Sequence, residues 1–196
     1  LFESGKIECL PSHRNNNPYY SWMSSVNQST KYKKVVASTT FTCGITESDK
    51  VDCWGFSYPD KNQTVKILSS GDYGLCIVDQ QDRPRCWRMD NWGKTYEENF
   101  PSRDYGSVTS IVNHEGSRFC LINSNHDLFC ENSLDSSFKF VSPPISIGKV
   151  LSVAIGQVTA CAIKENQEIE CWKYNDSNGL TKVSAPPKGF PSARQI

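Results

Sequence analysis

The sequence has no excess charge of either sign and no long apolar run. Lysine and arginine total 21 residues, and aspartate and glutamate also total 21, so the formal net charge is zero. A protein that binds nucleic-acid phosphates normally carries a basic stripe, so we expect no nucleic-acid partner. No apolar run approaches the roughly 20 residues that a membrane-spanning helix needs. A membrane link is therefore expected only through an anchor outside this chain.

Motifs for catalysis, metal binding or cofactor binding are also missing from the sequence. The chain has three histidines, His13, His114 and His126, which lie in separate segments and outside any nucleophile or metal motif. We expect all three to be solvated loop residues. No G-x-S-x-G nucleophile elbow is present. The sequence therefore predicts no catalytic residue, no metal ligand and no cofactor, and the protein is not expected to be an enzyme.

Cysteine, by contrast, is abundant and regularly placed. Eight of the nine cysteines belong to four segments in which nine residues separate two cysteines: CGITESDKVDCW, CIVDQQDRPRCW, CLINSNHDLFCE and CAIKENQEIECW, which begin at Cys43, Cys76, Cys120 and Cys161. Cys9 aligns with the second cysteine of a fifth, partly visible copy, "LFESGKIECL". We expect its partner to lie just before Leu1, outside the chain, so that this chain is either an excerpt of a longer propeller or a five-bladed ring that lacks a short join.

The nine-residue spacing favours a disulfide-bridged hairpin. If Cys161 faces Cys171 in an antiparallel pair, the next pair on the same face is Ile163 with Ile169, and both arms alternate correctly. Facing residues at a non-hydrogen-bonded position have Cα atoms about 4.5 Å apart, which a disulfide can span. The expected disulfides are Cys43 with Cys53, Cys76 with Cys86, Cys120 with Cys130, and Cys161 with Cys171. Zinc is the competing interpretation, but structural zinc sites favour cysteines two to four residues apart.

The two faces of each expected hairpin differ in polarity. The cysteine face is apolar in every copy, whereas the other face carries Asp52, Arg85 and Glu170. We expect this second face to be the wetter one.

Cysteine content and glycosylation sequons both indicate an oxidising compartment. Nine cysteines in 196 residues is high, and N-x-S/T sequons begin at Asn27, Asn62 and Asn175. All three sequons lie outside the hairpins, in expected surface connections. The sequence thus predicts a glycoprotein that is secreted or located on the extracellular face of the cell.

The repeated unit is larger than the hairpin. An apolar strand precedes each complete hairpin, and successive second cysteines are 44, 33, 44 and 41 residues apart. About forty residues with three or four short strands is typical of a β-propeller blade. A β-sandwich is the alternative, but it would not ordinarily repeat one disulfide hairpin in series. We predict an all-β chain of about five repeat units, a single propeller domain or an excerpt of one over residues 1–196, with hairpins at 1–9, 43–53, 76–86, 120–130 and 161–171.

The repeat resembles a known family. The segments "VAIGQVTACAIKENQEIECW" and "CGITESDKVDCWG" resemble the regulator of chromosome condensation repeat in its cysteine-containing form, as in Crinkly-type plant receptor kinase ectodomains. Glu131 and Leu10 depart from this pattern where the family has tryptophan. The resemblance implies a β-propeller, usually of seven blades, and an extracellular receptor or secreted module. The founding member's role as a nuclear exchange factor fits poorly with cysteine pairs and balanced charge.

Aromatic residues divide into two groups. Trp54, Trp87 and Trp172 follow the second cysteine of their repeats, and this fixed position favours packing between blades. Tyrosine and tryptophan in loops on a rigid scaffold are typical of recognition surfaces. The candidate partner-binding residues are therefore the aromatics outside the repeat pattern: Tyr19, Tyr20, Trp22, Trp92 and Tyr96.

These features predict an extracellular interaction module. It would bind a protein or peptide partner through propeller loops, as a receptor ectodomain or as a secreted binder or inhibitor. The alternatives are a secreted enzyme and a glycan-binding lectin, each with a site on one propeller face. A glycan ligand stays open, although the connections share no repeated loop motif that would bind sugars in every blade.

Overall fold

The computed structural model describes residues 29–55, 63–90, 92–133, 143, 147–175 and 179–183. Within these ranges four antiparallel sheets follow one another along the chain, and we call them blades 1 to 4. Blade 1 contains β1 (Tyr32–Ala37), β2 (Thr42–Thr46) and β3 (Val51–Trp54); blade 2 contains β4 (Val65–Ser70), β5 (Gly74–Asp79), β6 (Pro84–Met89) and β7 (Thr95–Glu97). Blade 3 contains β8 (Val108–His114), β9 (Arg118–Asn123) and β10 (Leu128–Asn132); blade 4 contains β11 (Val150–Ile155), β12 (Thr159–Lys164), β13 (Ile169–Asn175) and β14 (Gly179–Val183).

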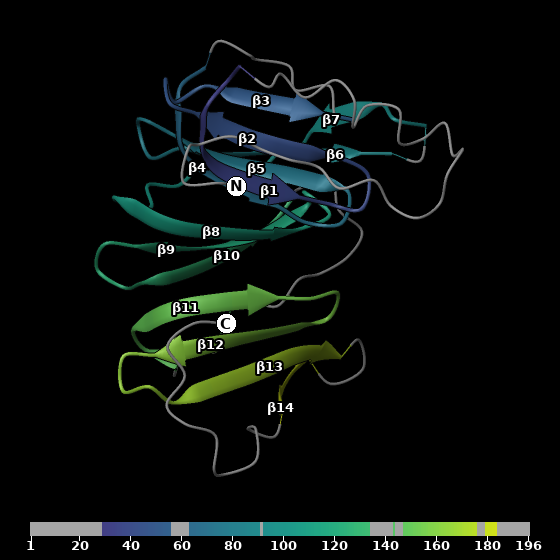
Figure 1. The fold of residues 1–196 in the computed structure, drawn as a ribbon. Coiled ribbons are helices and arrows are strands. Elements are labelled where there is room, and N and C mark those ends of the chain that lie inside the picture. Colours follow the sequence, from purple (N-terminus) through teal and green to yellow (C-terminus); the bar gives the residue numbers. More distant parts are fainter. Residues whose placement is uncertain are drawn as a thin grey trace.

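The blades are arranged as in a propeller. Each is a meander of neighbouring strands, and successive blades pack face to face in chain order (Figure 1). The first strands contact one another from blade to blade, β1 with β4, β4 with β8, and β8 with β11. This arrangement confirms the predicted all-β propeller fold of short three- or four-stranded blades. The hairpin expected at residues 1–9, with Cys9, lies outside the described residues.

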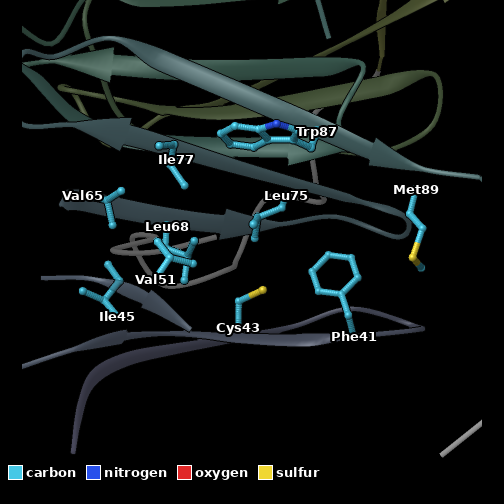
Figure 2. Close-up of a cluster of buried hydrophobic side chains, with 10 residues drawn as sticks. All are labelled: Phe41, Cys43, Ile45, Val51, Val65, Leu68, Leu75, Ile77, Trp87 and Met89. Atoms are coloured by element: carbon cyan, nitrogen blue, oxygen red, sulfur yellow. The ribbon is translucent and has the colours of Figure 1, made fainter. Parts of the chain in front are cut away.

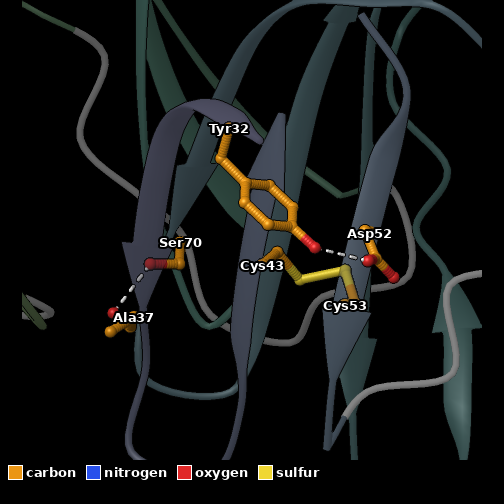
Figure 3. The surroundings of a disulfide bond; sticks show 6 residues. All are labelled: Tyr32, Ala37, Cys43, Asp52, Cys53 and Ser70. Atoms are coloured by element: carbon orange, nitrogen blue, oxygen red, sulfur yellow. Dashed lines mark hydrogen bonds between the residues drawn. A yellow bond between two sulfur atoms is a disulfide. The ribbon is translucent and has the colours of Figure 1, made fainter. Parts of the chain in front are cut away.

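The register of the hairpins is the one that the cysteine spacing predicts. Ile163 faces Ile169, and the same relation holds for Ile45 with Val51, Val78 with Pro84, and Ile122 with Leu128. Disulfides join Cys43 to Cys53, Cys76 to Cys86, Cys120 to Cys130 and Cys161 to Cys171, with Cα atoms 4.0 to 4.1 Å apart. Figure 3 shows the first of them between β2 and β3.

Each cysteine hairpin turns through the same tight loop. The sixth residue after the first cysteine has a left-handed backbone, with φ between 62° and 67°, at Asp49, Asp82, His126 and Gln167. Its N–H donates to the carbonyl three residues earlier, for example from Asp82 to Asp79 at 3.2 Å. A type I turn followed by one left-handed residue is a common three-residue hairpin connection, and aspartate and histidine enter that region more readily than most residues.

Both faces of the middle blades are largely buried, so the second face is less wet than its charged residues predicted, although the Arg85 side chain stays 35% exposed. Cys76, Cys86 and Val78 lie in the core cluster between blades 2 and 3. On the opposite face of blade 2, Leu75, Ile77 and Trp87 pack against Phe41 and other residues of blade 1 (Figure 2). Even Glu170 is only 9% exposed. The physical reason is that a propeller covers both faces of a blade with its neighbours, whereas an isolated hairpin would bury only one.

Two of the three repeat tryptophans occupy the interfaces between blades that the repeat predicts, and the third is buried within its own blade. Trp87 and Trp172 are each 1% exposed, and they belong to the clusters between blades 1 and 2 and between blades 3 and 4. Trp54 is 5% exposed and contacts the ring of Tyr32 edge-on at a centroid distance of 5.3 Å. In blades 1, 2 and 4 one face thus carries the disulfide and the other carries the tryptophan.

Two glycines allow blades 2 and 3 to approach closely. A Cβ on Gly74 would lie 1.8 Å from the backbone nitrogen of Gly116, and a Cβ on Gly116 would lie 2.2 Å from the carbonyl oxygen of Trp87. No side chain fits at either position. The interface therefore depends on backbone contact as well as on apolar packing.

A repeated hydrogen bond links each blade to the next. The N–H groups of Val65, Val108 and Val150 open the first strands of blades 2, 3 and 4. They donate to the preceding hairpin tip, at Asp49 O (2.8 Å), Asp82 Oδ1 (2.6 Å) and His126 O (2.9 Å). The left-handed hairpin residue therefore also sets the position of the next blade.

Candidate interaction surface

The turns of the propeller lie at two ends. In an antiparallel meander alternate turns share an end, so the turns between first and second strands lie on the same side as the β6–β7 hairpin. We call this side the first-turn face; it comprises residues 38–41, 71–73, 92–94, 115–117 and 156–158. The tips of the four disulfide hairpins lie at the other end.

Trp92 stands at the tip of the outer hairpin of blade 2. Its side chain is 92% exposed, in contrast to the buried tryptophans of the repeats. Asp90 holds this hairpin, because its Oδ1 atom accepts hydrogen bonds from the N–H groups of Trp92 and Lys94, both at 2.9 Å. Its Oδ2 atom accepts the hydroxyl proton of Tyr96 at 3.0 Å. Trp92 is therefore an exposed apolar side chain on a well-connected turn.

Cations surround the Tyr96 ring. The Lys94 ammonium lies 4.8 Å from the ring centroid, and the Arg88 guanidinium lies 5.6 Å from it. Partial desolvation acts to raise the pKa of Asp90, but its hydrogen bonds from Lys94, Trp92 and Tyr96 outweigh this and hold that pKa below its usual value. The hairpin thus presents Trp92 next to an aromatic and cationic patch.

A groove lies on the outer side of blade 2, beyond the far end of β7. Its volume is about 420 Å³, and it runs between the start of β6 and the connection to blade 3. Arg85 makes a two-pronged ion pair with Glu97, at 2.7 and 3.0 Å. Arg103 pairs with Glu131 at 2.9 Å. Burial raises the pKa of Glu131, although the charge of Arg103 acts in the opposite direction.

Tyr105 contributes to the wall of this groove. The residue is 4% exposed, and its buried hydroxyl has no hydrogen-bond partner in the part of the chain that the structure describes. Burial raises its pKa to about 12. A buried hydroxyl without a partner costs about 1–3 kcal/mol, so this position is incompletely satisfied by the described residues.

A polar network runs across the first-turn face. The hydroxyls of Ser38 and Thr39 in blade 1 donate to the Asp72 carbonyl in blade 2. The Asp72 carboxylate lies 3.8 Å from Nε2 of His114 in blade 3. Arg118 then donates to His114 Nδ1 at 2.8 Å and to the Gln157 carbonyl of blade 4 at 2.5 Å.

His114 is therefore not the solvated loop residue that the sequence predicts. It is the last residue of β8, and its side chain is 13% exposed. Burial lowers its pKa, and the charge of Arg118 lowers it further, while Glu115 and Asp72 oppose the change. His126, by contrast, does lie at a hairpin tip, with 43% of its side chain exposed.

The structure brings together some of the predicted site residues and leaves others undescribed. Trp92 and Tyr96 belong to one hairpin, although the sequence predicted only a connection there and not strand β7. Asn175 is the last residue of β13 and pairs with Gly179 of β14, so it belongs to a blade and not to a connection outside the strands. Six predicted residues lie outside the described ranges: Cys9, Tyr19, Tyr20, Trp22, Asn27 and Asn62.

Sequence reasoning missed the groove. Its residues come from a hairpin tip and from the connection between blades, and no shared motif marks them. The only available signal was the long segment after Cys86, which is rich in aromatic and charged residues. Within the described ranges, no group of three histidine, cysteine or acidic side chains is arranged to hold a metal. The described residues also include no helix that is long and apolar enough to cross a membrane.

The fold and its bridged hairpins define a class: a β-propeller with a disulfide in each described blade. No protein-family model matches the sequence. No curated protein matches it either. Solved structures do resemble it. The Crinkly WD40 ectodomain of the Arabidopsis thaliana receptor kinase ACR4 matches with a TM-score of 0.53 and 21% identity, over 78% of this chain and 51% of that one.

Two further structures extend the comparison. The entire ectodomain of the Physcomitrella patens receptor kinase CR4 matches with a TM-score of 0.57 and 19% identity, over 81% of this chain and 46% of that one. Prp20p from Saccharomyces cerevisiae, whose structure was described with its binding to Gsp1p and histones, matches with a TM-score of 0.56 and 12% identity, over 81% and 52%. These likenesses confirm the predicted kind of propeller. The chain spans about half the length of the structures it matches.

Proposed function

We propose that this chain is an extracellular interaction module that binds a protein or peptide partner, with Trp92 as an anchor of the contact. The observation that carries the proposal is the 92% exposure of Trp92 on a turn fixed by three hydrogen bonds to Asp90. Tryptophan is enriched among the residues that dominate binding energies, and a rigid turn loses little entropy when it binds.

The disulfides support the extracellular part of the proposal. Four bridges in the described residues would persist in an oxidising compartment and would be rare in a cytosolic protein. The likeness to two receptor kinase ectodomains agrees with this location, and Prp20p, another propeller of this kind, binds the protein partners Gsp1p and histones. Glycans at Asn27, Asn62 and Asn175 are part of the same proposal.

A first experiment tests the location. Expressed behind a secretion signal in cultured cells, the chain should reach the medium, lose mass on treatment with an N-glycosidase, and contain four disulfides by peptide mapping. Retention in the cell with reduced cysteines and no glycan would contradict the extracellular proposal.

A second experiment tests the binding surface. The secreted protein, tagged as a tetramer, is screened against an array of displayed extracellular proteins. The Trp92→Ala variant should lose at least tenfold in affinity for a hit and should keep the wild-type melting temperature. Val158→Ala is the matched control, because Val158 is also exposed on the first-turn face, at 53%. Undiminished binding by the Trp92 variant would remove Trp92 from the site.

The predicted aromatic residues that lie outside the described ranges can be tested in the same screen. Replacing Tyr19, Tyr20 and Trp22 together by alanine should weaken binding if they contribute to the same surface, as their loop position in the sequence predicts. A hit that needs these residues but not Trp92 would move the anchor to that segment. Binding to an array of glycans alone, with no protein hit, would favour the lectin alternative.

A further inference from the structure

The groove beside β6 and β7 lies outside the first-turn face. We propose that this groove binds a short acidic peptide segment of a partner protein, in which carboxylate side chains flank an apolar one. The inference concerns a different surface from the Trp92 hairpin and does not depend on it.

Two guanidinium groups give the groove an exposed positive charge. Arg83 is 69% exposed while its partner Asp79 is 1% exposed, and Arg103 is 52% exposed while its partner Glu131 is 15% exposed. In both pairs the carboxylate is far less exposed than the cation, which faces solvent. An approaching ligand therefore meets the positive partner of each pair.

Both arginines keep hydrogen-bonding capacity. Arg103 donates to Glu131 through Nη1, and its other two guanidinium nitrogens have no hydrogen-bond partner among the residues that the structure describes. Arg83 donates through Nε to Asp79 and through Nη2 to Gln81. Among the described residues its Nη1 has no hydrogen-bond partner, so this nitrogen can donate to a ligand. Carboxylates suit these forked donors, which bind them in two-pronged geometry.

Part of the remaining lining is apolar, and the two carboxylates in it, Glu97 and Glu98, are already paired with Arg85 and Arg88. Pro84, Phe100 and Pro101 line the groove, and Phe100 is held against Phe119 at a centroid distance of 4.8 Å. The buried Tyr105 hydroxyl, which has no partner in the described ranges, belongs to the same wall. A free phosphate would use only the charge, whereas an acidic peptide with an apolar side chain would use the charge, the apolar walls and the hydrogen-bond donors together.

The balanced charge of the whole chain favours a short acidic ligand over an extended polyanion. Its formal net charge is zero, and the groove lining carries three arginines and two glutamates, so the positive charge of the groove is small and local. A polyanion such as nucleic acid or heparin would need a wider basic surface. A short segment with two or three carboxylates matches the two arginines that face solvent.

The test uses a panel of fluorescent hexapeptides in which two glutamates flank one variable apolar residue, with a second panel that has glutamine in place of glutamate. At least one acidic peptide should bind with a dissociation constant below about 1 mM in fluorescence anisotropy, and its glutamine form should bind at least tenfold more weakly. Failure of every acidic peptide at that concentration would overturn the proposal. Equal binding of the two panels would overturn it as well.

Two variants locate the contact. Arg103→Gln should weaken the acidic peptide at least tenfold. Because this change also leaves Glu131 without its partner, Ser102→Glu serves as a second variant: it adds a negative charge at the exposed rim of the groove and keeps the Arg103 pair. Lys33→Gln is the matched control, since it removes a half-exposed cation from blade 1. Peptide binding that survives both groove variants would contradict the site.

Competition distinguishes the sources of negative charge. Inorganic phosphate at physiological ionic strength should not displace the peptide. If phosphate or heparin displaces it as well as an unlabelled acidic peptide does, the groove is a general anion site and the proposal is wrong. The Trp92→Ala variant should bind the peptide like the wild type, so this result and the test of the proposed function can fail separately.

Discussion

At the residue scale, the third residue after the first cysteine caps its own hairpin in blades 1, 2 and 3. Side-chain oxygens of Thr46, Asp79 and Asn123 accept a hydrogen bond from the N–H four residues later, at 3.0 to 3.1 Å. Asp79 accepts the largest number of hydrogen bonds among the three, because the Gln81 N–H also donates to it at 2.9 Å and Arg83 Nε donates to it at 2.8 Å. Burial acts to raise the pKa of Asp79, but these hydrogen bonds outweigh it and hold the pKa below its usual value.

Replacing Asp79 tests this cap. Asp79→Ala should lower the free energy of unfolding by about 2 kcal/mol, because two backbone N–H groups and Arg83 lose their acceptor at a position that is 1% exposed. Asp79→Asn should cost less, because Asn123 makes the same backbone contacts at the equivalent position of blade 3. Urea titration measures both changes. Equal losses in the two variants would show that the backbone cap contributes little.

At the element scale, the sequence contains enough to place the hairpins. The C-x9-C spacing and the alternating apolar residues determine which residues face each other, because the side-chain period of a strand is two. Trp87 and Trp172 could be assigned to interfaces because their position recurs. These features are local to one repeat, and the structure agrees with them.

Features that depend on contact between blades could not be predicted in this way. His114 lies at a turn in the sequence, but Arg118 and the neighbouring blades bury it. Arg103 and Tyr105 belong to a connection without a repeat pattern, so nothing in the sequence indicates that they meet β6 and β7. The burial of the second face in blades 2, 3 and 4 was missed for the same reason, since only the neighbouring blade covers it.

The four disulfides should differ in their resistance to reduction. Each closes a short loop, which is worth about 3 kcal/mol in the chain-entropy model. Cys76 and Cys86 are 0% exposed between blades 2 and 3, whereas Cys161 is partly exposed and Cys171 is 9% exposed. A reductant reaches exposed sulfur first, so Cys161–Cys171 should open before Cys76–Cys86.

Stepwise reduction with differential alkylation and mass spectrometry measures this order. Full reduction should lower the melting temperature, because the loop constraints on the unfolded chain are lost. Before reduction, the unfolded protein should show at most one free thiol, from Cys9. Five or more thiols, or an unchanged melting temperature after reduction, would contradict the disulfide assignment.

At the scale of the whole molecule, the blades are joined by two kinds of contact. Buried clusters fill the space between the disulfide face of one blade and the aromatic face of the next. The polar network of the first-turn face links blades 2, 3 and 4 through Asp72, His114, Arg118 and the Gln157 carbonyl. The packing of the buried clusters is insensitive to pH, whereas the polar network contains a histidine, His114.

Protonation of His114 should loosen the propeller. Arg118 can only donate hydrogen bonds, so its 2.8 Å contact with Nδ1 requires that nitrogen to lack a proton, and a charged imidazole would also repel the guanidinium. Because the folded state lowers the pKa of His114, the unfolded chain takes up the proton first. The contribution of neutral His114 to the free energy of unfolding is therefore present above pH 6.5, which is about the pKa of a histidine in the unfolded chain. It is lost as the pH falls below that value. Melting temperatures measured between pH 7.5 and pH 5 should decline in the wild type and decline less in His114→Gln. The same slope in both proteins would show that this histidine does not couple the blades to pH.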